Sequence, residues 1–414
     1  MKTGYECATC RRIFESEEIV YKCPFCASAA DTEDPAKGFD TGCLSVVFTP
    51  SARLAPGKPV DPLFLLPFPI RDWPSYPAGN TPVVHPAILQ KKTGFPRLAL
   101  KNDTLNPSGS LKDRASLLVA AQAWVHGEKR VALASTGNAG ASMACAGAAY
   151  GLNVVLFVPA SAPRAKLLQS LLYGARVVPV KGSYDDAFSL SIAYTNEFGG
   201  INRNTAYNPF TVEGKKTVSI EIYNQLGCGV PDVVYVPTGD GVIYCGACKG
   251  FADLVKAGCA DKMPVMIAVQ AEGSNALAQS WRDGRETVIS RASTIADSLS
   301  VCRPASGHMA LAFLRETRGR AVEVSDAEIS GAQAELCREA GVFVEPSSAA
   351  AWAGFLKDRH QVDPESRIVV LLTGTGFKDT GAAEKLVSLP PACDANLEDA
   401  TKLLADVYGI HARR

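Results

Sequence analysis

From Lys112 onward, short strand-like runs alternate with longer helix-like apolar runs, and this alternation restricts the fold more than any other feature. The strand-like runs include VALAS, VVLFVP, RVVPV, VVYVP, VMIAV and IVVLLTG. Such nearly continuous apolar runs are typical of parallel strands that are buried on both faces. Several helix-like runs stop at a glycine, which suits the left-handed residue that ends a helix: Gly151, Gly174 and Gly227. The pattern predicts an α/β protein with two parallel-sheet lobes.

The 414 residues are too many for one compact core, so the chain should divide into lobes. The N-terminal segment is rich in cysteine, and a stretch rich in Pro, Asp, Gly and Ala follows it as a connector. We expect an N-terminal unit over 1–30, a connector over 31–80, a larger lobe from 81–120 and 213–390, a smaller lobe over 121–212, and a C-terminal helix or tail over 391–414.

The charge composition argues against some classes of partner. Lys and Arg together number 42, as do Asp and Glu, so the formal net charge is zero and neither nucleic acid nor a membrane is expected as a partner. The N-terminus MKTGYECATC lacks the apolar core of a signal peptide. We therefore expect a cytoplasmic protein. The odd total of 13 cysteines favours reduced thiols over a disulfide framework.

Two CxxC pairs stand near the N-terminus: Cys7 with Cys10, and Cys23 with Cys26. Each pair can direct two thiolates at one centre from a tight turn, and the residues between the pairs fit a short hairpin. Four thiolates around one Zn²⁺ form a closed structural site. The alternatives are reduced thiols in a flexible tail, or a redox pair, although no βαβ unit surrounds the motif. We interpret the segment as a small zinc ribbon.

Ligands of α/β folds gather at the carboxyl ends of strands, so glycine-rich segments that follow predicted strands are candidate binding sites. Four segments qualify: NPSGSLKDRAS, STGNAGAS, TGDGVIYCGACKG and LLTGTGFKD. Small residues leave backbone N–H groups free for a carboxylate or phosphate at a helix N-terminus. The third segment fits neither a Walker A loop nor a dinucleotide fingerprint, and any one such turn alone is often only a turn. Its CGAC, Cys245 to Cys248, lies at a predicted helix start, where packing is favoured over redox chemistry.

Lys112 stands where the first of these segments becomes an apolar helix-like run. Burying an ammonium is costly unless something compensates for the lost solvent. An amine that is desolvated enough to lose its proton, beside a nest for phosphate, is what a Schiff-base enzyme requires. The arrangement favours a lysine that is covalently linked to pyridoxal phosphate (PLP).

The chain resembles the fold type II PLP enzymes, which are tryptophan synthase β-like, and most closely the threonine synthase family. The motifs run in the family's order over nearly the whole length: GNTPV, NPSGSLKDRAS, ASTGNAGAS, TAYNPFTVEGKKT, PTGDG, VFVEPSSAAA and LLTGTGFKD. A zinc-ribbon-like N-terminal segment also occurs in parts of that family. The resemblance implies a homodimer that binds PLP and a small amino-acid substrate.

The resemblance also implies roles for individual residues. Lys112 would bond to the cofactor and then move protons as the general base. Asn138 would hydrogen-bond the cofactor's phenolic oxygen, and Thr373 would meet the pyridine nitrogen, which a hydroxyl leaves largely neutral. The phosphate would be held by backbone N–H groups of Gly239, Asp240, Gly241, Val242 and Ile243. The substrate carboxylate would be held by Ser135 and Thr136 with nearby backbone amides, and Asn204 and Thr205 are further candidate substrate-binding residues.

The implied reaction converts O-phosphohomoserine and water into threonine and phosphate. The family commonly carries an arginine for the substrate phosphate where this chain has Thr211, and a threonine where it has Ala139. An arginine binds phosphate more strongly than a hydroxyl does. The remaining candidate phosphate partners are Asn204, Thr205, Lys215 and Arg114, each of which has an equally good structural interpretation.

Three hypotheses therefore stay open. The first is threonine synthase activity. The second keeps the scaffold but changes the substrate, as in a cysteate synthase that uses O-phosphoserine or in a serine/threonine dehydratase. The third is a zinc-ribbon protein that binds a partner or a nucleotide on a catalytically idle α/β body.

Overall fold

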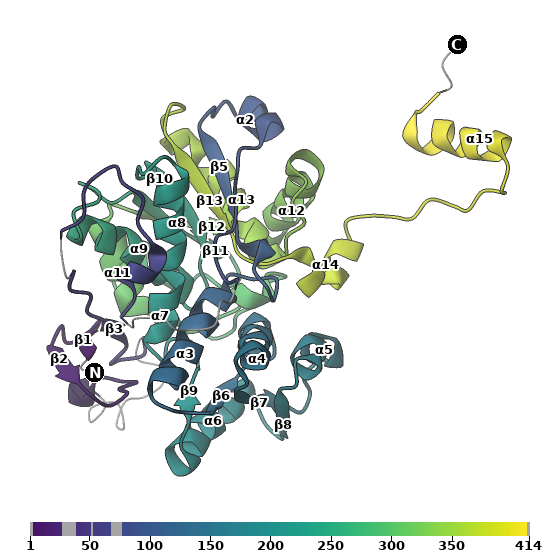
Figure 1. Ribbon diagram of the computed structural model, residues 1–414. Coiled ribbons are helices and arrows are strands. Elements are labelled where there is room, and N and C mark those ends of the chain that lie inside the picture. Colours follow the sequence, from purple (N-terminus) through teal and green to yellow (C-terminus); the bar gives the residue numbers. More distant parts are fainter. Residues whose placement is uncertain (1–2, 27–38, 51–52, 68–76, 412–414) are drawn as a thin grey trace.

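The computed structural model describes residues 3–26, 39–50, 53–67 and 77–411. Two α/β lobes lie one above the other, with the small N-terminal unit beside the lower lobe (Figure 1). The predicted connector falls partly outside the described residues. Its described part contributes β3 (Leu44–Val46) and the 3₁₀ helix η1 (Pro62–Leu65).

The upper, larger lobe is built on one mixed sheet. Its strand order is β12-β11-β10-β13-β5-β4, and every neighbouring pair is parallel except the antiparallel pair of β4 and β5. The strands are β4 (Val83–Val84), β5 (Leu98–Asn102), β10 (Val233–Pro237), β11 (Val265–Ala271), β12 (Arg320–Val324) and β13 (Ile368–Leu372). The central strands β5, β10 and β13 are buried at every position, as their apolar sequences predict.

Alternate residues of these strands face two separate helical layers. Val234 and Val369 pack with α8 (Thr217–Gln225), α9 (Val242–Lys256) and α11 (Gly307–Glu316). Tyr235 and Val370 pack on the opposite face with α2 (Ala87–Thr93), α12 (Asp326–Ala340) and α13 (Pro346–Asp358). A helix α10 (Ala276–Asp283) and the 3₁₀ turns η3 (Asp297–Leu299) and η4 (Arg359–Gln361) complete the lobe.

The lower, smaller lobe has a fully parallel sheet of order β8-β7-β6-β9. Its strands are β6 (Arg130–Ala134), β7 (Asn153–Pro159), β8 (Arg176–Val180) and β9 (Ile201–Asn202). One face packs against α3 (Lys112–Val125) and α4 (Asn138–Tyr150), with α5 (Arg164–Leu172) beside them, and the other against α6 (Tyr184–Phe198). The structure thus contains the two predicted parallel-sheet lobes.

Helix ends follow the predicted glycines. Gly151, Gly174 and Gly227 all have positive φ values, of 64°, 83° and 72°; Gly151 follows α4 directly, and the other two lie one residue further past the ends of α5 and α8. A separate short helix α7 (Phe210–Lys215) precedes α8 and divides the segment KKTVSIEIYNQLG near its start.

The N-terminal unit is a three-stranded antiparallel sheet of order β2-β1-β3, formed by β1 (Thr3–Cys7), β2 (Ile13–Ser16) and β3. The predicted hairpin between the two CxxC pairs is therefore wrong. The hairpin joins β1 to β2 across the first pair, because the turn at Cys7 to Cys10 is the one that reverses the chain. Tyr5 and Leu44 belong to the same apolar cluster as Val131 and Val154, so the unit packs on the core of the smaller lobe.

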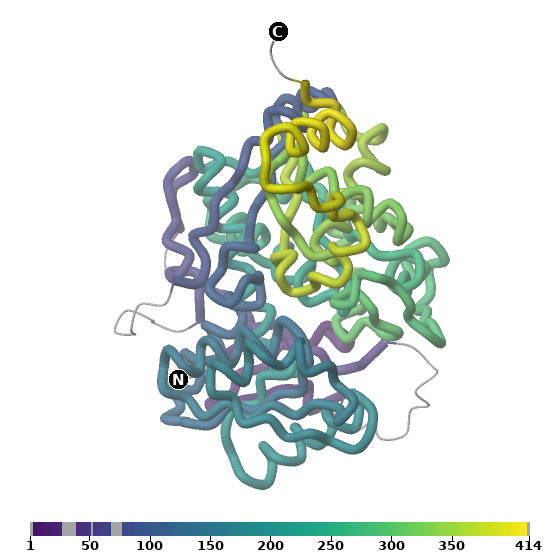
Figure 2. The backbone as a smooth tube through the Cα atoms, turned by 90° about the vertical axis from the view of Figure 1, so that its right-hand side faces the viewer, coloured from purple at the N-terminus to yellow at the C-terminus, as the bar shows by residue number. Residues whose placement is uncertain are grey.

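The C-terminal segment leaves the larger lobe through η5 (Gly376–Lys378) and α14 (Thr380–Glu384). It ends in α15 (Leu397–Tyr408), which stands clear of the body in Figure 1 and lies in front of it, toward the viewer, in Figure 2. None of the helices in the described ranges combines the length and apolar character needed to cross a bilayer.

Candidate active site

The predicted site residues come together where the carboxyl ends of both sheets meet. Lys112 is the first residue of α3, which follows β5 and η2 (Asp103–Leu105), and Asn138 is the first residue of α4, directly after β6. Thr373 follows β13 without a gap. The backbone N–H of Leu111 donates to the carbonyl of Thr373 over 2.8 Å, which fixes the start of α3 beside that strand. The topology therefore gathers these segments at one edge.

Lys112 is partly exposed at the start of its helix. Desolvation lowers the pKa of its ammonium, and the nearby carboxylates Asp240 and Glu345 oppose this shift while the Arg203 guanidinium adds to it. A lysine whose pKa is lowered in this way has more of its amine in the unprotonated form, which is the form that attacks an aldehyde.

The turn between β10 and α9 forms a backbone nest. Gly241 has φ of 89°, and the N–H of Val242 donates to the Asp240 carboxylate over 2.9 Å. A Cβ added at Gly239 would lie 3.0 Å from both the Leu299 Cα and the Ser298 carbonyl oxygen, so the backbone comes too close for a side chain. N–H groups in the first turn of α9 have no partner within the helix and add the positive end of its dipole. This nest fits a phosphate.

The second predicted segment caps α4. The hydroxyl of Ser135 accepts hydrogen bonds from the N–H groups of Gly137 (3.2 Å) and Gly140 (3.0 Å), while Thr136 stays partly exposed beside it. Ser135 thus holds the loop in shape, and the Thr136 backbone and hydroxyl lie next to it for a carboxylate.

Glu345 is a site residue that the sequence reasoning missed. The amide nitrogen of Asn138 donates to both carboxylate oxygens of Glu345, over 2.9 and 3.1 Å, across the gap between the lobes. Burial raises the pKa of Glu345, with Asn138 and Lys112 opposing the shift. The available signal was its place directly before Pro346, at the start of α13 and level with the other segments.

Asn204 and Thr205 lie in the loop after β9 and differ in availability. The Asn204 amide is already engaged, since its oxygen accepts from the N–H of Ala134 (2.7 Å) and its nitrogen donates to Ser191 (2.7 Å). Thr205 is partly exposed, and its hydroxyl accepts from the Arg203 guanidinium over 2.8 Å. Thr211, at the position of the family's arginine, is fully buried and donates its hydroxyl proton to the Asn208 carbonyl over 2.8 Å.

A cavity of about 300 Å³ opens between the lobes at this edge. Its lining includes Asn138, Gln169, Ser298, Glu345 and Lys378. The Lys378 ammonium donates to the Gln169 side chain, so α5 of the smaller lobe and η5 of the larger lobe meet there. The cavity thus gives a small polar molecule access to the predicted site.

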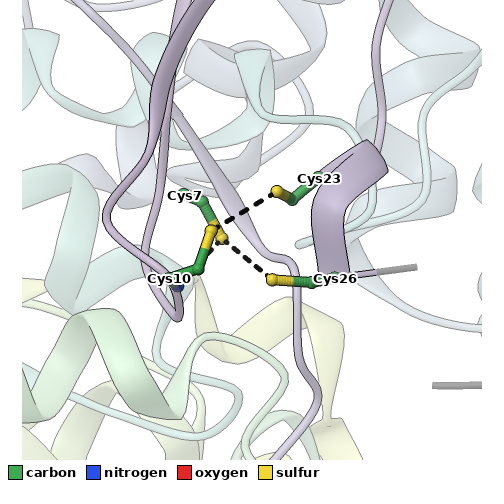
Figure 3. A group of neighbouring side chains, drawn as sticks. All are labelled: Cys7, Cys10, Cys23 and Cys26. Atoms are coloured by element: carbon green, nitrogen blue, oxygen red, sulfur yellow. Dashed lines mark hydrogen bonds between the residues drawn. The ribbon is translucent and has the colours of Figure 1, made fainter. Parts of the chain in front are cut away.

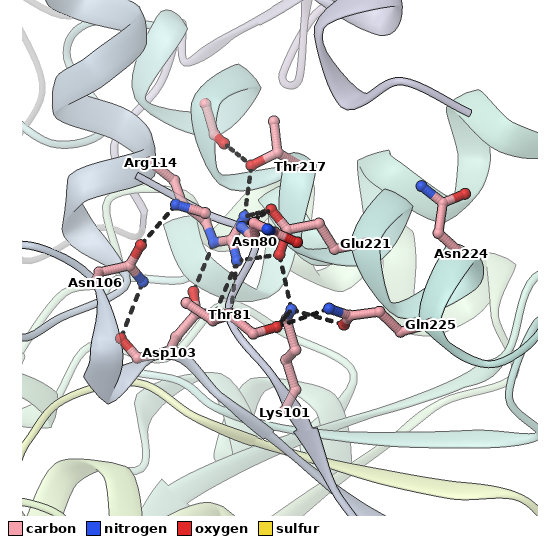
Figure 4. Close-up of polar contacts among 12 residues, drawn as sticks. Asn80, Thr81, Lys101, Asp103, Asn106, Arg114, Thr217, Glu221, Asn224 and Gln225 are labelled. Carbon is pink, nitrogen blue, oxygen red and sulfur yellow. Dashed lines mark hydrogen bonds and ion pairs between the residues drawn. The ribbon is translucent and has the colours of Figure 1, made fainter. Parts of the chain in front are cut away.

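Arg114, one of the candidate phosphate partners, is already engaged in ion pairs. Its guanidinium pairs with Asp103 (2.6 Å) and Glu221 (2.6 Å), and Lys101 joins the same glutamate over 2.7 Å (Figure 4). Both cations are almost fully buried. These ion pairs join α3, α8 and β5 and leave Arg114 committed to the fold.

The four predicted zinc ligands also come together. The sulfur atoms of Cys7, Cys10, Cys23 and Cys26 all lie within 4.8 Å of one another (Figure 3). Cys10 is exposed, and the other three are buried. Four thiolates that converge in this way can hold a tetrahedral metal ion. Cys245 and Cys248 are buried free thiols in the packed start of α9, as the packing interpretation predicts.

Several known proteins are similar in sequence to this chain. The sequence model of the family described as "Pyridoxal-phosphate dependent enzyme" matches residues 74–374, which include Lys112, Asn138, the turn from Gly239 to Ile243 and Thr373. The chain belongs to this family of PLP-dependent enzymes. Its relatives include the threonine synthase of Methanosarcina acetivorans, which is 31% identical over 95% of this chain and 96% of the relative. The threonine synthase of Methanocaldococcus jannaschii is 34% identical over 80% of this chain and 82% of its own length.

Solved structures show the same fold at low identity. Maize serine racemase matches with a TM-score of 0.65 and 23% identity, covering 74% of this chain and 91% of its own. Threonine deaminase isoform 2 of Solanum lycopersicum matches with a TM-score of 0.68 and 20% identity, covering 86% and 96%. The predicted fold type II architecture and the resemblance to threonine synthases are confirmed, and the enzyme is a PLP-dependent lyase.

Proposed function

We propose that this PLP-dependent enzyme is a threonine synthase, which converts O-phospho-L-homoserine and water into L-threonine and phosphate. The observation that carries the proposal is the set of relatives named threonine synthase, at 31% and 34% identity over most of both chains. The third sequence hypothesis, an idle α/β body, does not account for a family match over residues 74–374.

The residues at the edge between the lobes fit the cofactor. The nest from Gly239 to Ile243 would hold its phosphate, Lys112 would bond to its aldehyde, and Thr373 would meet the pyridine nitrogen. When bound, PLP supplies the electron sink that makes a proton next to the substrate amine acidic. Lys112 then accepts and returns protons, because desolvation lowers the pKa of its ammonium and leaves more of the amine unprotonated.

The other polar groups orient the substrate and cofactor. Ser135 and Thr136 hold the substrate carboxylate at the start of α4. Asn138 binds the cofactor's phenolic oxygen, and Glu345 fixes the Asn138 amide through the contacts at 2.9 and 3.1 Å. Thr205, on the loop after β9, offers its hydroxyl to the rest of the substrate, and the loop's Asn204 holds that segment against β6 through Ala134.

The four converging cysteines support a structural Zn²⁺ in the N-terminal unit, held by Cys7, Cys10, Cys23 and Cys26. A closed site with four protein ligands leaves no position for a substrate, so the metal stabilises the fold and takes no part in the reaction. The enzyme acts in the cytoplasm as a homodimer, as the family resemblance implies.

A second candidate, an enzyme of the same scaffold that uses O-phosphoserine, is favoured by one observation. Thr211 is buried with its hydroxyl bonded to the backbone, so it does not replace the arginine that threonine synthases commonly place there. The missing arginine at this position favours a substrate whose phosphate is bound differently, such as the shorter O-phosphoserine.

The assay of product decides between the two. Purified enzyme with PLP is given O-phosphohomoserine, or O-phosphoserine with sulfite, or free serine and threonine, and both phosphate release and amino-acid product are measured. We expect threonine and phosphate in equal amounts from O-phosphohomoserine. Cysteate from O-phosphoserine, with no threonine from O-phosphohomoserine, would replace the first candidate by the second.

A further inference from the structure

Two cations behind the candidate site lack a carboxylate partner. Lys215 and Arg203 are both fully buried. Among the residues that the structure describes, the Lys215 ammonium has no hydrogen-bond partner, and the Arg203 guanidinium bonds only to hydroxyls, that of Thr205 at 2.8 Å and that of Ser116 at 3.4 and 3.5 Å. Within the described residues, no carboxylate oxygen lies within 4.0 Å of either cation.

The other deeply buried cations in the described part of the chain show the contrast. Lys101 pairs with Glu221, Arg114 with Asp103, Lys216 with Asp253 and Lys249 with Glu213, at 2.6 to 2.9 Å. Lys215 is the last residue of α7 and Lys216 follows it directly, yet of these two only Lys216 has a carboxylate partner among the described residues. The absence of a partner at Lys215 is therefore specific to its side of α7.

That side of α7 faces the candidate site. A Cβ added at Gly214 would collide with the Arg114 carbonyl in the first turn of α3, and one added at Gly246 would lie 2.6 Å from the Lys215 Cβ. Lys215 is thus held between the helix that starts at Lys112 and the first turns of α9, which follow the nest. The charges of Asp240, Lys112 and Arg203 act on its ammonium.

The buried position of Lys215 destabilises its ammonium, and a bound anion would offset this cost. A buried ammonium without acceptors loses its hydration and gains no hydrogen bond in return, and burial lowers the pKa of Lys215 well below its usual value. The nest, in turn, contains the carboxylate of Asp240, whose charge opposes a bound dianion. A phosphate in the nest would give Lys215 its missing acceptor, and Lys215 would offset the charge of Asp240.

We infer that Lys215, supported by Arg203, binds the dianionic phosphate of a phosphate monoester in this site. The phosphate can come from the cofactor or from the substrate, since both are monoesters under the proposed function on which this inference rests. Arg203 contacts the Thr205 hydroxyl, so it also supplies a cation at the start of the loop that carries Thr205.

The test replaces Lys215 with methionine, which keeps the length of the side chain and removes its charge. We expect the Lys215→Met protein to bind one of the two phosphate monoesters about 10- to 100-fold more weakly, the loss of a charge-assisted hydrogen bond. Binding is measured by absorbance titration of apo-protein with PLP, by calorimetric titration of holoenzyme with inorganic phosphate, and by the change in the bound-PLP spectrum within the first turnover after holoenzyme is mixed with O-phosphohomoserine. Arg203→Met should weaken the same ligand by a smaller factor.

Phosphate-free ligands identify the source. If the cofactor's phosphate is bound, the variant loses affinity for PLP and keeps its affinity for pyridoxal. If the substrate's phosphate is bound, the variant keeps PLP and loses O-phosphohomoserine and inorganic phosphate, while L-homoserine is unaffected. These binding measurements do not require turnover, so a failure of the threonine synthase assay leaves them intact.

Thermal stability gives an independent test, because the substitution that weakens ligand binding should stabilise the apo-protein. Removing an unpartnered ammonium should raise the thermal midpoint of apo-Lys215→Met above that of the wild type. The matched control is Lys216→Met, which should lower the midpoint because Glu213 and Asp253 lose one partner, and should leave every ligand affinity unchanged. Unchanged affinity of Lys215→Met for PLP, O-phosphohomoserine and inorganic phosphate would overturn the inference, as would a lowered thermal midpoint with no change in binding.

Discussion

Gly241 shows how a single residue prepares the candidate site. Its φ of 89° lies in a region that residues with a side chain rarely adopt, and an added Cβ would meet Ser306 at 3.4 Å. The positive φ turns the backbone so that the first N–H groups of α9 point toward one position, where the cofactor's phosphate is proposed to bind. The glycine is required there by backbone geometry and by the ligand together.

Gly241→Ala should therefore weaken PLP binding by about 5-fold or more, since the strain of about 1 kcal/mol falls on the nest itself. The control is Gly227→Ala, because Gly227 also has a positive φ, of 72°, but has nothing within 4 Å of an added Cβ. Both variants should lose similar thermal stability, and only Gly241→Ala should lose PLP in an absorbance titration. Equal PLP affinity in the two variants would argue against the nest as the phosphate site.

Glu221 should make the stability of the fold depend on pH, with stability falling in acid. Burial raises the pKa of this carboxyl, and the paired cations Arg114 and Lys101 lower it more strongly, from 4.5 to about 2. A carboxyl whose pKa is lowered by folding stabilises the fold fully above the unfolded value and loses that contribution as the pH falls through the folded value. The stabilisation, at most about 3 kcal/mol, should disappear between pH 4.5 and pH 2.

Denaturant midpoints at pH 7, 5 and 3 check this expectation. The wild type should lose stability steeply below pH 4.5. Glu221→Gln should be less stable at pH 7, because buried Lys101 loses its carboxylate partner and Arg114 keeps Asp103 but loses Glu221, and should show a shallower decline in acid. Parallel pH curves for the two proteins would show that Glu221 does not carry the effect.

Residues in the glycine-rich segments could be predicted from the sequence, because their chemistry is local: a turn, a helix start and a lysine within a few positions. Glu345 and Arg203 could not be predicted in the same way. The contact between Asn138 and Glu345 joins residues 207 positions apart, and the missing partner of Arg203 becomes visible only when the surrounding side chains are placed.

Among the elements, the long apolar strands are predictable because their nearly continuous apolar residues indicate burial. The helices that end at glycines are predictable because glycine commonly terminates a helix. The edge strand β12 was missed because its RAVEV sequence is only partly buried. The strands β4 and β9 have two residues each, too few for a recognisable pattern. The break between α7 and α8 was missed because no proline or glycine marks Lys216.

The N-terminal unit makes a contact that could not be predicted from its sequence. The ring of Tyr21 stacks on that of Tyr207, with centroids 4.8 Å apart and planes inclined by 13°, and its hydroxyl accepts from the N–H of Asn202 over 3.0 Å. Tyr207 and Asn202 flank the loop that carries Thr205. The unit therefore supports the loop that carries Thr205, the residue proposed to contact the substrate.

Removing the metal from this unit should act on the substrate and leave the cofactor in place. Chelation of the proposed zinc, or Tyr21→Ala with zinc retained, should raise the KM for the phosphorylated substrate by about 10-fold, the equivalent of about 1.4 kcal/mol. The absorbance of bound PLP should not change. Ile13→Ala, at an exposed position of β2 in the same unit, is the control and should be silent. Release of PLP on chelation would show that the unit belongs to the cofactor site.

At the scale of the whole molecule, the site exists only because the two lobes meet. Lys166 pairs with Asp297 (2.9 Å), and Asn138 bonds Glu345, so both contacts cross from the smaller to the larger lobe around the cavity of about 300 Å³. Lys112 lies at this junction, as the first residue of a helix that packs on the smaller lobe and follows a strand of the larger one. The sequence order alone predicts two lobes, but their contacts depend on side chains far apart in the chain.

The position of the covalent cofactor bond tests this account most directly. Holoenzyme is treated with borohydride, which reduces the bond between a lysine and PLP to a stable amine, and the adduct is located by mass spectrometry of the digested protein. The account predicts a single pyridoxyl adduct on Lys112, and no cofactor absorbance band in Lys112→Ala. An adduct on another lysine, or a wild-type protein that takes up no PLP, would contradict it.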